Sequence, residues 1–537
     1  MGGARLAIHP VDLAIIVLYL TGIVGLGCWA GMKRKSGIEG KSYFLAGRSL
    51  TWPVIGLALF STNISTIHLV SLAQEGYVNG LAYGNFEWMA AFTLIALSLF
   101  FAPFYIRSDV ATLPDFLEKR FSRASRDWLA IISIISAVFI HIGFSLYTGA
   151  VVLRGLFGID IMTSIIGISL LTGLYTIIGG LLAVVLTESI QTIVLVIGAV
   201  CITAIGMIKI GGWSGLAESV DPVKLTILRS ADDPSGLPWY SVFLGYPIIG
   251  LWYWCADQTI VQRVLGAKDE NHARVGPLFA GFIKILPVFI FVLPGLVCLG
   301  LINGGKLPNE LTDSADTYAF MITHLLPPGL KGIVAAALLA ALMSTVSGAL
   351  NSIATLFSFD IYRRWRPETS DRKLVIIGRV VTFIAMIAAI AWSPFVSHFQ
   401  SIFQGIVAII CYVAPPISTV FVLGVFWKRA SAAAATVTLW SGSAMGFTVF
   451  LLDWFKEQTG WNVPAMMTTF YLFVICMTIM IAVSLAKPHV HTEESVALVW
   501  KNPLEALRGE SWKGIGNYRL LAATLFIVMI ALYIIFS

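Results

Sequence analysis

Residues 60–77 read FSTNISTIHLVSLAQEGY and place a run of polar side chains inside an otherwise apolar stretch of the chain. The hydrogen-bonding residues stand almost in a row: Ser61, Thr62, Asn63, Ser65, Thr66 and His68. In a bilayer, irregular backbone is tolerated only where it is buried in protein or lines a cavity. The stretch therefore predicts a helix over 51–75 that is broken near its middle.

The composition of the whole chain indicates a membrane protein. It has 537 residues, of which 58% are hydrophobic and only 12% charged, with a mean hydropathy of +0.86. A soluble domain carries about 25% charged residues, and a spanning helix needs about 20 apolar ones. The candidate spans are 11–31, 51–75, 84–106, 127–156, 160–179, 183–207, 239–262, 275–301, 331–358, 374–395, 400–427, 432–452, 466–486 and 518–536. We expect an all-α membrane protein with about 14 transmembrane helices and no room for a soluble catalytic domain.

The distribution of basic residues predicts the topology. Most of the 35 Lys and Arg residues fall in alternate loops, such as KRKSGIEGK (33–41) and YRRWRPETSDRK (362–373). Basic loops remain cytoplasmic, so we expect both termini on the extracytoplasmic side. The net charge of +6 then reflects topology in a lipid bilayer, with no nucleic acid partner. The lack of large external insertions favours a plasma membrane of the bacterial inner-membrane type.

Two ionisable residues of opposite charge, Glu87 and Lys284, lie well inside apolar segments. Ionisable groups in spans are costly and by default mark functional sites. The pair is either a structural ion pair or a set of hydrogen-bonding groups that faces a polar solute. His68 is either a satisfied core histidine or a group that binds and releases protons near neutral pH.

A second broken helix is expected five spans after the first. The stretch YPIIGLWYWCADQTIVQR (246–263) contains Pro247, Gly250 and Asp257 around a dense run of aromatic residues. Paired broken helices in two inverted repeats, with a binding site near the bilayer midplane, are typical of secondary transporters. The recurrence of these features predicts a transporter.

The ninth span carries a candidate sodium site. Ala341, Ser344 and Thr345 stand at i, i+3 and i+4 and so share one helical face. Their two hydroxyls and the Ala341 carbonyl, together with the carbonyls of Ser61 and Ile64 at the first break, would form a cage of five oxygens. The alternative is that Ser and Thr here serve only helix packing.

Four stretches carry a resemblance to a known family: LWYWCADQTIVQR (251–263), FIKILPVFIFVLPG (282–295), LMSTVSGALNSIATLFSFDIY (342–362) and VAPPISTVFVLGVFWKR (413–429). They resemble the sodium/solute symporter family, most closely its sodium–glucose and sodium–galactose cotransporter branch. The resemblance implies a LeuT-type 5+5 inverted repeat. It divides the chain into an extra N-terminal helix and loop (1–50), two five-helix repeats (51–207 and 239–428) and three C-terminal helices (432–537) with a cytoplasmic loop (487–517).

The resemblance also implies roles for individual residues. The sodium site matches Ser61, Ile64, Ala341, Ser344 and Thr345. The solute site matches Asn63, His68, Glu87, Tyr253, Trp254 and Lys284, with Tyr253 stacking on a sugar ring and forming the inner gate. The outer gate matches Leu72, Phe86 and Phe403. A second ion site or ion path matches Glu188 and Ser347.

Three positions depart from the family pattern. Val407 stands where a sugar-binding Gln is expected, Glu188 replaces Asp, and Gly348 follows Ser347 where a second hydroxyl is expected. We therefore expect one sodium ion per cycle and leave the solute open.

The favoured function is a sodium-coupled symporter that imports a hexose-like sugar by alternating access. The alternatives are a symporter for a polyol such as inositol, a carboxylate, a vitamin or a nucleoside, and a non-transporting sensor. No enzymatic activity is expected, because no nucleophile–base pair or metal cluster stands near the polar run.

Overall fold

The computed structural model describes residues 9–32, 43–233, 236–398, 402–489 and 491–537, without the side chains of 398 and 402–404. Within these ranges the chain is helical, with no extended strand. The first half contains α1 (Pro10–Met32), α3 (Trp52–Asn63), α4 (Thr66–Asn79), α5 (Asn85–Ala96), α6 (Ala102–Arg107), α7 (Leu113–Arg120), α8 (Arg123–Ser136), α9 (Ser145–Phe157), α10 (Ile161–Ile210) and α11 (Gly212–Ser219). The second half contains α12 (Trp239–Leu251), α13 (Gln258–Leu265), α14 (Glu270–Ile283), α15 (Leu293–Asn303), α16 (Thr317–Leu325), α17 (Leu330–Leu356), α18 (Arg363–Trp365) and α19 (Asp371–Trp392). It ends with α20 (Ile402–Phe426), α21 (Ala432–Trp454), α22 (Lys456–Thr459), α23 (Ala465–Ala486), α24 (Glu493–Ala497) and α25 (Tyr518–Ile535).

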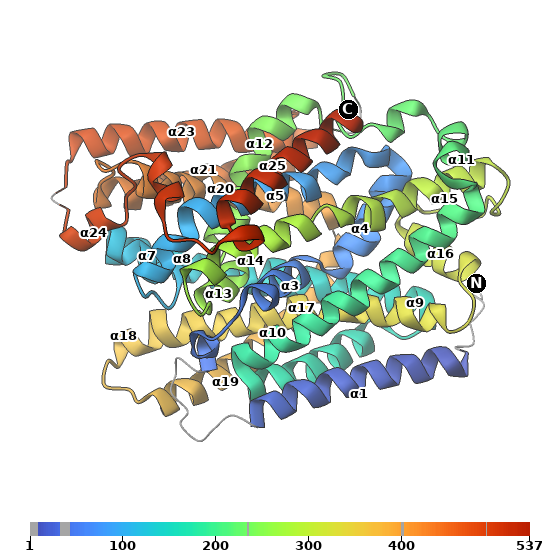
Figure 1. The fold of residues 1–537 in the computed structure, drawn as a ribbon, viewed down its shortest axis with the longest axis horizontal. Coiled ribbons are helices and arrows are strands. Elements are labelled where there is room, and N and C mark those ends of the chain that lie inside the picture. The colour runs from blue at the N-terminus through green and yellow to red at the C-terminus, as the bar shows by residue number, and fades with distance from the viewer. Residues whose placement is uncertain (1–8, 33–42, 234–235, 399–401, 490) are drawn as a thin grey trace.

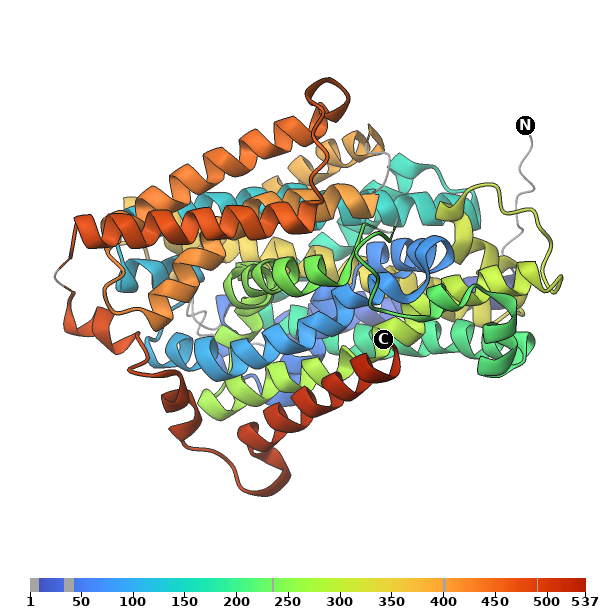
Figure 2. The same ribbon diagram turned by 90° about the horizontal axis from the view of Figure 1, so that it is seen from above.

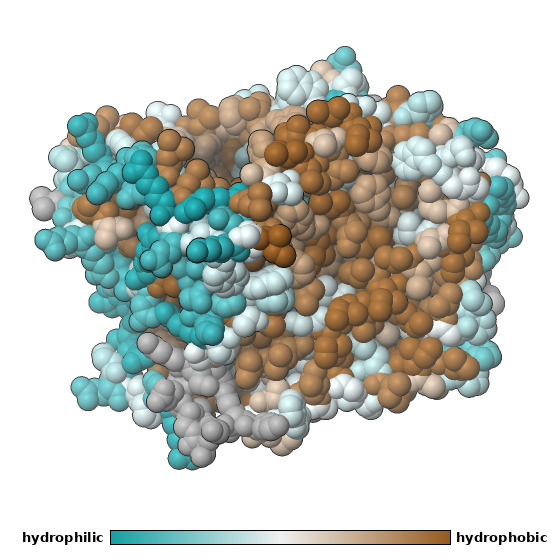
Figure 3. All heavy atoms as spheres, viewed as in Figure 1, coloured by the Kyte–Doolittle hydropathy of each residue, from teal (hydrophilic) through white to brown (hydrophobic). Residues whose placement is uncertain are grey.

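Eleven helical segments in the described ranges are long and apolar enough to cross a membrane. Most helices run roughly along the long axis of the molecule, and the view in Figure 3 shows broad hydrophobic surface between more hydrophilic ends (Figures 1 and 3). The candidates 160–179 and 183–207 are two helical stretches of α10, which is kinked between them at Gly180, where φ is +62°. The eleven segments count this 50-residue element once, and the count of about 14 crossings stays a prediction, whereas the all-helical, apolar architecture is as expected.

The first helix break lies where the polar run predicts it. α3 ends at Asn63, Ile64 and Ser65 are extended, and α4 begins at Thr66. The Ser65 hydroxyl accepts a hydrogen bond from the Ile67 amide, and His68 Nδ1 accepts one from the Ser65 amide. This capping box satisfies amide groups that the break would otherwise leave unpaired.

The second break is also present. α12 continues into a π-helical turn over Trp252–Ala256, the chain is extended at Asp257, and α13 then begins. The Asp257 carboxylate accepts a hydrogen bond from the Thr259 amide at 2.7 Å and so caps α13. Both interruptions occur in the middle of the protein, where their freed polar groups meet other side chains.

Helix packing relates the two halves of the chain. α10 packs along α17, and each broken helix lies on a helix of the other half, α3 on α14 and α12 on α5 (Figures 1 and 2). This exchange is what two inverted five-helix repeats over 51–207 and 239–428 would produce. We retain these boundaries as predictions.

Both ends of the described chain are hydrogen-bonded to segments that lie between other helices or at the start of one. Asp12 near the start of α1 accepts hydrogen bonds from the Gly329 and Gly332 amides, both at 2.7 Å. At the other end, the Phe536 carbonyl accepts one from the Ile227 amide at 2.7 Å.

Residues 491–517, in the predicted cytoplasmic loop, lie against the helix ends. The Arg120 guanidinium at the end of α7 is 1% exposed and donates to the carbonyls of Gly424 and Trp427 and to the Ser495 hydroxyl. Burial and the neighbouring Arg120 lower the pKa of His491, so its neutral ring can accept from the same guanidinium at 3.3 Å. One arginine thus joins α7, the end of α20 and this segment.

Replacing Arg120 should release the 487–517 segment. We expect Arg120→Ala to make it cleavable by limited proteolysis under conditions where the parent protein resists, because several hydrogen bonds to one charged group are lost. The matched control is Arg123→Ala, since Arg123 is largely exposed and contacts Asp127 at 3.8 Å. Equal cleavage of parent and Arg120→Ala protein would show that Arg120 does not anchor the segment.

Candidate functional site

A cavity of about 130 Å³, partly open to solvent, lies beside both helix breaks. The polar and aromatic residues that line it include Asn63, His68, Glu87, His141, Tyr253, Trp254 and Lys284. The structure thus brings all six residues of the predicted solute site to one cavity.

A continuous hydrogen-bonded chain runs through these residues. The Asn63 amide donates to the Tyr253 hydroxyl at 3.1 Å, and the Lys284 ammonium donates to the Asn63 carbonyl oxygen at 2.6 Å. Lys284 also pairs with Glu87. His68 Nε2 lies 3.8 Å from the other Glu87 oxygen. Asn63 comes from the first break, so this break contributes a side chain directly to the cavity.

Two aromatic residues frame the chain. Tyr253 and Trp254 pack edge to face with ring centroids 5.2 Å apart, and the Lys284 ammonium lies 5.6 Å from the Trp254 ring centroid. Tyr246, which the sequence interpretation missed, also lines the cavity and donates from its hydroxyl to the Phe86 carbonyl at 2.7 Å. Aromatic faces beside polar groups suit a solute with both CH faces and hydroxyls.

The three residues expected at the outer gate have different surroundings. Phe86 lines the cavity. Leu72 is fully buried on α4 and is not among the lining residues. Phe403 belongs to α20, and its side chain lies outside the described part of the chain.

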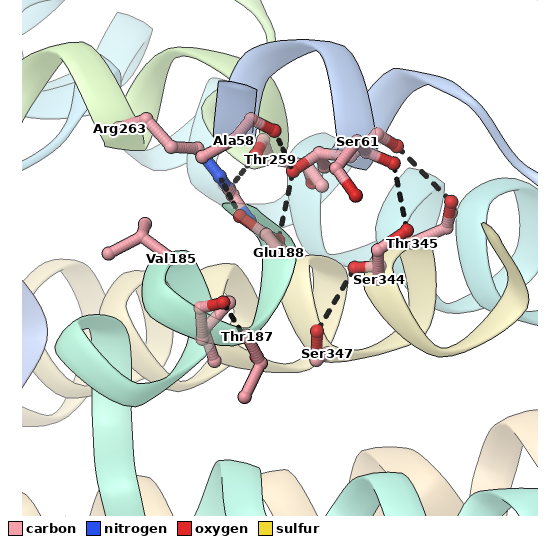
Figure 4. A network of polar contacts seen from close by, with 12 residues as sticks. Ala58, Ser61, Val185, Thr187, Glu188, Thr259, Arg263, Ser344, Thr345 and Ser347 are labelled. Atoms are coloured by element: carbon pink, nitrogen blue, oxygen red, sulfur yellow. Dashed lines mark hydrogen bonds and ion pairs between the residues drawn. The ribbon is translucent and has the colours of Figure 1, made fainter. Parts of the chain in front are cut away.

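Four of the five residues predicted to hold sodium lie together, and three of them are labelled in Figure 4. The Ser344 hydroxyl donates to the Ser61 carbonyl at 2.8 Å and to the Ala341 carbonyl at 3.0 Å. The Thr345 hydroxyl donates to the carbonyls of Thr62 and Ala341, each at 3.2 Å. Hydroxyls of α17 thus meet carbonyls at the end of α3, a set of neutral oxygens suited to a hard monovalent cation. Ile64 lies at the same break, fully buried.

Glu188 is paired with an arginine that the sequence interpretation did not connect to it. Arg263 Nη2 lies 2.6 Å from a Glu188 oxygen, and both side chains are fully buried (Figure 4). The Thr62 hydroxyl donates to the same carboxylate at 2.9 Å. A buried arginine is costly unless it is paired or hydrogen-bonded, so the position of Arg263 in the seventh span was the signal that could have indicated this contact.

Gly348 makes room for this ion pair. A Cβ atom there would lie 2.4 Å from Arg263 Nη2, 2.9 Å from Thr62 Cγ2 and 3.1 Å from Glu188 Oε1. Ser347 donates to the Ser344 carbonyl at 3.0 Å. Any residue with a side chain at position 348 would therefore clash with the Glu188–Arg263 pair.

A methyl group at position 348 should destabilise the protein. We expect Gly348→Ala to lower the stability by about 1–3 kcal/mol, the usual cost of overpacking a core, seen as a lower unfolding temperature in detergent. The matched control is Gly167→Ala in α10, where an added Cβ meets nothing within 4 Å. Unchanged unfolding of Gly348→Ala would show that the ion pair can move aside.

A second buried pair was also missed by the sequence interpretation. His141 Nε2 lies 2.9 Å from an oxygen of Asp257, the residue that caps α13. His141 lines the cavity, and its ring centroid is 6.0 Å from that of Tyr253. The pair ties the second break to the helix that contains His141.

The family model described as the sodium:solute symporter family matches residues 43–442 of this chain. The chain belongs to the sodium:solute symporter family. The match spans both helix breaks and every residue of the predicted sodium and solute sites. The resemblance noted in the sequence is therefore confirmed, and the protein is a sodium-coupled solute symporter and a multi-pass membrane protein.

Curated members of the family are similar over most of this chain. Sodium/myo-inositol cotransporter 2 of Oryctolagus cuniculus is 34% identical over 490 residues, covering 85% of this chain and 72% of the relative. Sodium/glucose cotransporter 4 of Danio rerio is 33% identical over 539 residues, covering 93% of this chain and 82% of the relative. Sodium/glucose cotransporter 2 of Rattus norvegicus is 34% identical over 485 residues, covering 83% and 72%.

Solved structures show the same fold. A Na⁺-coupled sialic acid symporter in a substrate-bound outward-open state matches with a TM-score of 0.78 at 22% identity, covering 90% of this chain and all of that one. A nucleobase-cation-symport-1 family transporter in a closed conformation matches with a TM-score of 0.50 at 15% identity, covering 85% and 97%. The fold of this symporter is thus one shared by cation-coupled transporters, and sodium is its coupling ion.

Proposed function

We propose that this symporter imports a sugar, with the solute bound in the cavity between the two helix breaks. The observation that carries the proposal is the hydrogen-bonded chain from Tyr253 through Asn63 and Lys284 to Glu87, beside two aromatic rings. Sugar hydroxyls both donate and accept hydrogen bonds, so they suit a row of amide, ammonium and carboxylate groups. The CH face of a pyranose ring suits Tyr253 and Trp254.

The first helix break would couple sodium to the solute. Carbonyls of Ser61 and Thr62 meet the hydroxyls of Ser344 and Thr345, whereas the next residue, Asn63, reaches into the cavity. A cation held by these oxygens, with the Ile64 carbonyl as a further ligand, would fix the backbone that positions Asn63. Sodium and solute would then stabilise the same arrangement, which is the condition for coupling.

The driving force is sufficient for accumulation. One charge moved through ~100 mV releases ~2.3 kcal/mol, and a tenfold sodium gradient adds ~1.4 kcal/mol. Together these would concentrate a neutral sugar roughly 500-fold.

We propose that the basic loops face the cytoplasm and that both termini lie outside, in a plasma membrane such as a bacterial inner membrane.

The test is uptake into proteoliposomes of labelled hexoses, pentoses and myo-inositol, with an inward sodium gradient and with potassium in its place. The proposal predicts accumulation of a sugar in sodium that potassium does not support. If folded protein accumulates no sugar, the sugar assignment is wrong. Myo-inositol is included because a relative that is 34% identical is a sodium/myo-inositol cotransporter, and accumulation of myo-inositol alone would assign a polyol.

A further inference from the structure

Part of the cavity wall is apolar. Ile406, Val407 and Ile410 of α20 line it together with Ile140 and Ile249. Ile410 follows Ile406 by four positions and Val407 by three, so the three residues share one face of α20. Within the described side chains, this face offers a solute no hydrogen-bonding group.

The hydrogen-bonding groups come from other helices. Asn63 and His68 flank the first break, Glu87 lies on α5, and Lys284 follows α14. A solute held by these groups and by the Tyr253 ring must place some of its surface against the aliphatic residues of α20. The chemistry of that part of the solute is therefore constrained by Ile406, Val407 and Ile410.

A hydroxyl packed against Ile406, Val407 and Ile410 would lose its water without gaining a hydrogen-bond partner from these three side chains. Leaving one such group unpaired costs about tenfold or more in affinity. A CH₂ or CH₃ group at the same place loses nothing and gains contacts with the aliphatic side chains. With one CH face of the ring on Tyr253, a hexose that meets this wall with its edge would place a hydroxyl here.

We propose that the preferred solute is a monodeoxy sugar whose deoxygenated carbon packs against Ile406, Val407 and Ile410. The inference rests on the proposed sugar transport and narrows it to a class of sugar. Within this wall we take Val407 as the specificity-determining residue to test, because it lines the cavity and lies on the same helical face as Ile410. Glutamine at this position would supply both a donor and an acceptor to a hydroxyl.

The experiment is competition against sodium-driven uptake of the hexose that proteoliposomes accumulate. Each monodeoxy analogue of that hexose is compared with the parent sugar, in the unmodified protein and in Val407→Gln. We expect at least one analogue to compete at about tenfold lower concentration than the parent, and Val407→Gln to reverse that preference. Ile409→Gln is the matched control, since Ile409 is on the same helix but does not line the cavity, and it should leave the ratio unchanged.

The outcomes separate this inference from the broader proposal. If the accumulated hexose competes better than all its monodeoxy analogues, the inference is wrong and sugar transport still stands. A preference for an analogue that Val407→Gln does not change would also overturn it, because the α20 face would then not be the cause. Failure to accumulate any sugar would overturn both.

Discussion

Replacing Ser344 and Thr345 together by alanine should abolish sodium-driven uptake. Their hydroxyls lie 2.8–3.2 Å from the carbonyls of Ser61, Thr62 and Ala341. Each substitution would remove one hydroxyl oxygen from the proposed cation site, which should lower the sodium affinity about tenfold or more. In the double variant, the sodium concentration that gives half-maximal uptake should rise about 100-fold or more, so that uptake is abolished at the sodium concentrations that saturate the parent protein.

Two control variants make this prediction specific. Thr345→Ser keeps the hydroxyl and should retain sodium dependence. Ser352→Ala removes a buried hydroxyl on the same helix that has no hydrogen-bond partner among the described residues, so it should leave the half-maximal sodium concentration unchanged. If the double variant keeps the sodium dependence of the parent protein, these hydroxyls do not bind the coupling ion.

Removing Lys284 should have the second large effect, on both stability and transport. Lys284 and Glu87 are 1% and 2% exposed and paired with each other. Lys284→Met would leave a buried carboxylate without its cation, which costs about 3–5 kcal/mol. We expect a markedly lower unfolding temperature in detergent and no sodium-driven uptake.

A double variant separates the structural role of the pair from its role in binding. Glu87→Gln with Lys284→Met removes both charges and should recover much of the lost stability. It should not recover uptake, because the ammonium donor next to Asn63 is still missing. If the double variant transports as the parent does, the pair is purely structural, which was the alternative left open by the sequence.

The sequence predicts those parts of the site in which one segment carries the signal by itself. The polar run 61–68 indicates a broken helix because a lipid-facing backbone cannot leave its groups unpaired, and the break lies at Ile64 and Ser65. The i, i+3, i+4 spacing of Ala341, Ser344 and Thr345 likewise defines a face of α17. The opposite charges of Glu87 and Lys284 predict a contact because neither is stable alone in an apolar span.

Contacts between distant segments were harder to predict. Glu188 and Arg263 are 75 positions apart, and His141 and Asp257 are 116 apart. Either acidic residue could have paired with several basic ones, and periodicity within one helix does not choose among them. Leu72 is buried away from the cavity, and Arg120 holds residues 491–517 against the helix ends. Both features depend in the same way on tertiary packing.

The most direct test of the account is the linkage between the two ligands, measured by equilibrium binding of the accumulated labelled sugar to purified protein in sodium and in potassium. If the α3–α4 break serves both sites, sodium should increase the affinity for the sugar, and the sugar should increase the affinity for sodium by the same factor. Ser344→Ala with Thr345→Ala should remove this linkage. Equal sugar affinity in sodium and potassium for the unmodified protein would contradict the claim that the break couples the two sites.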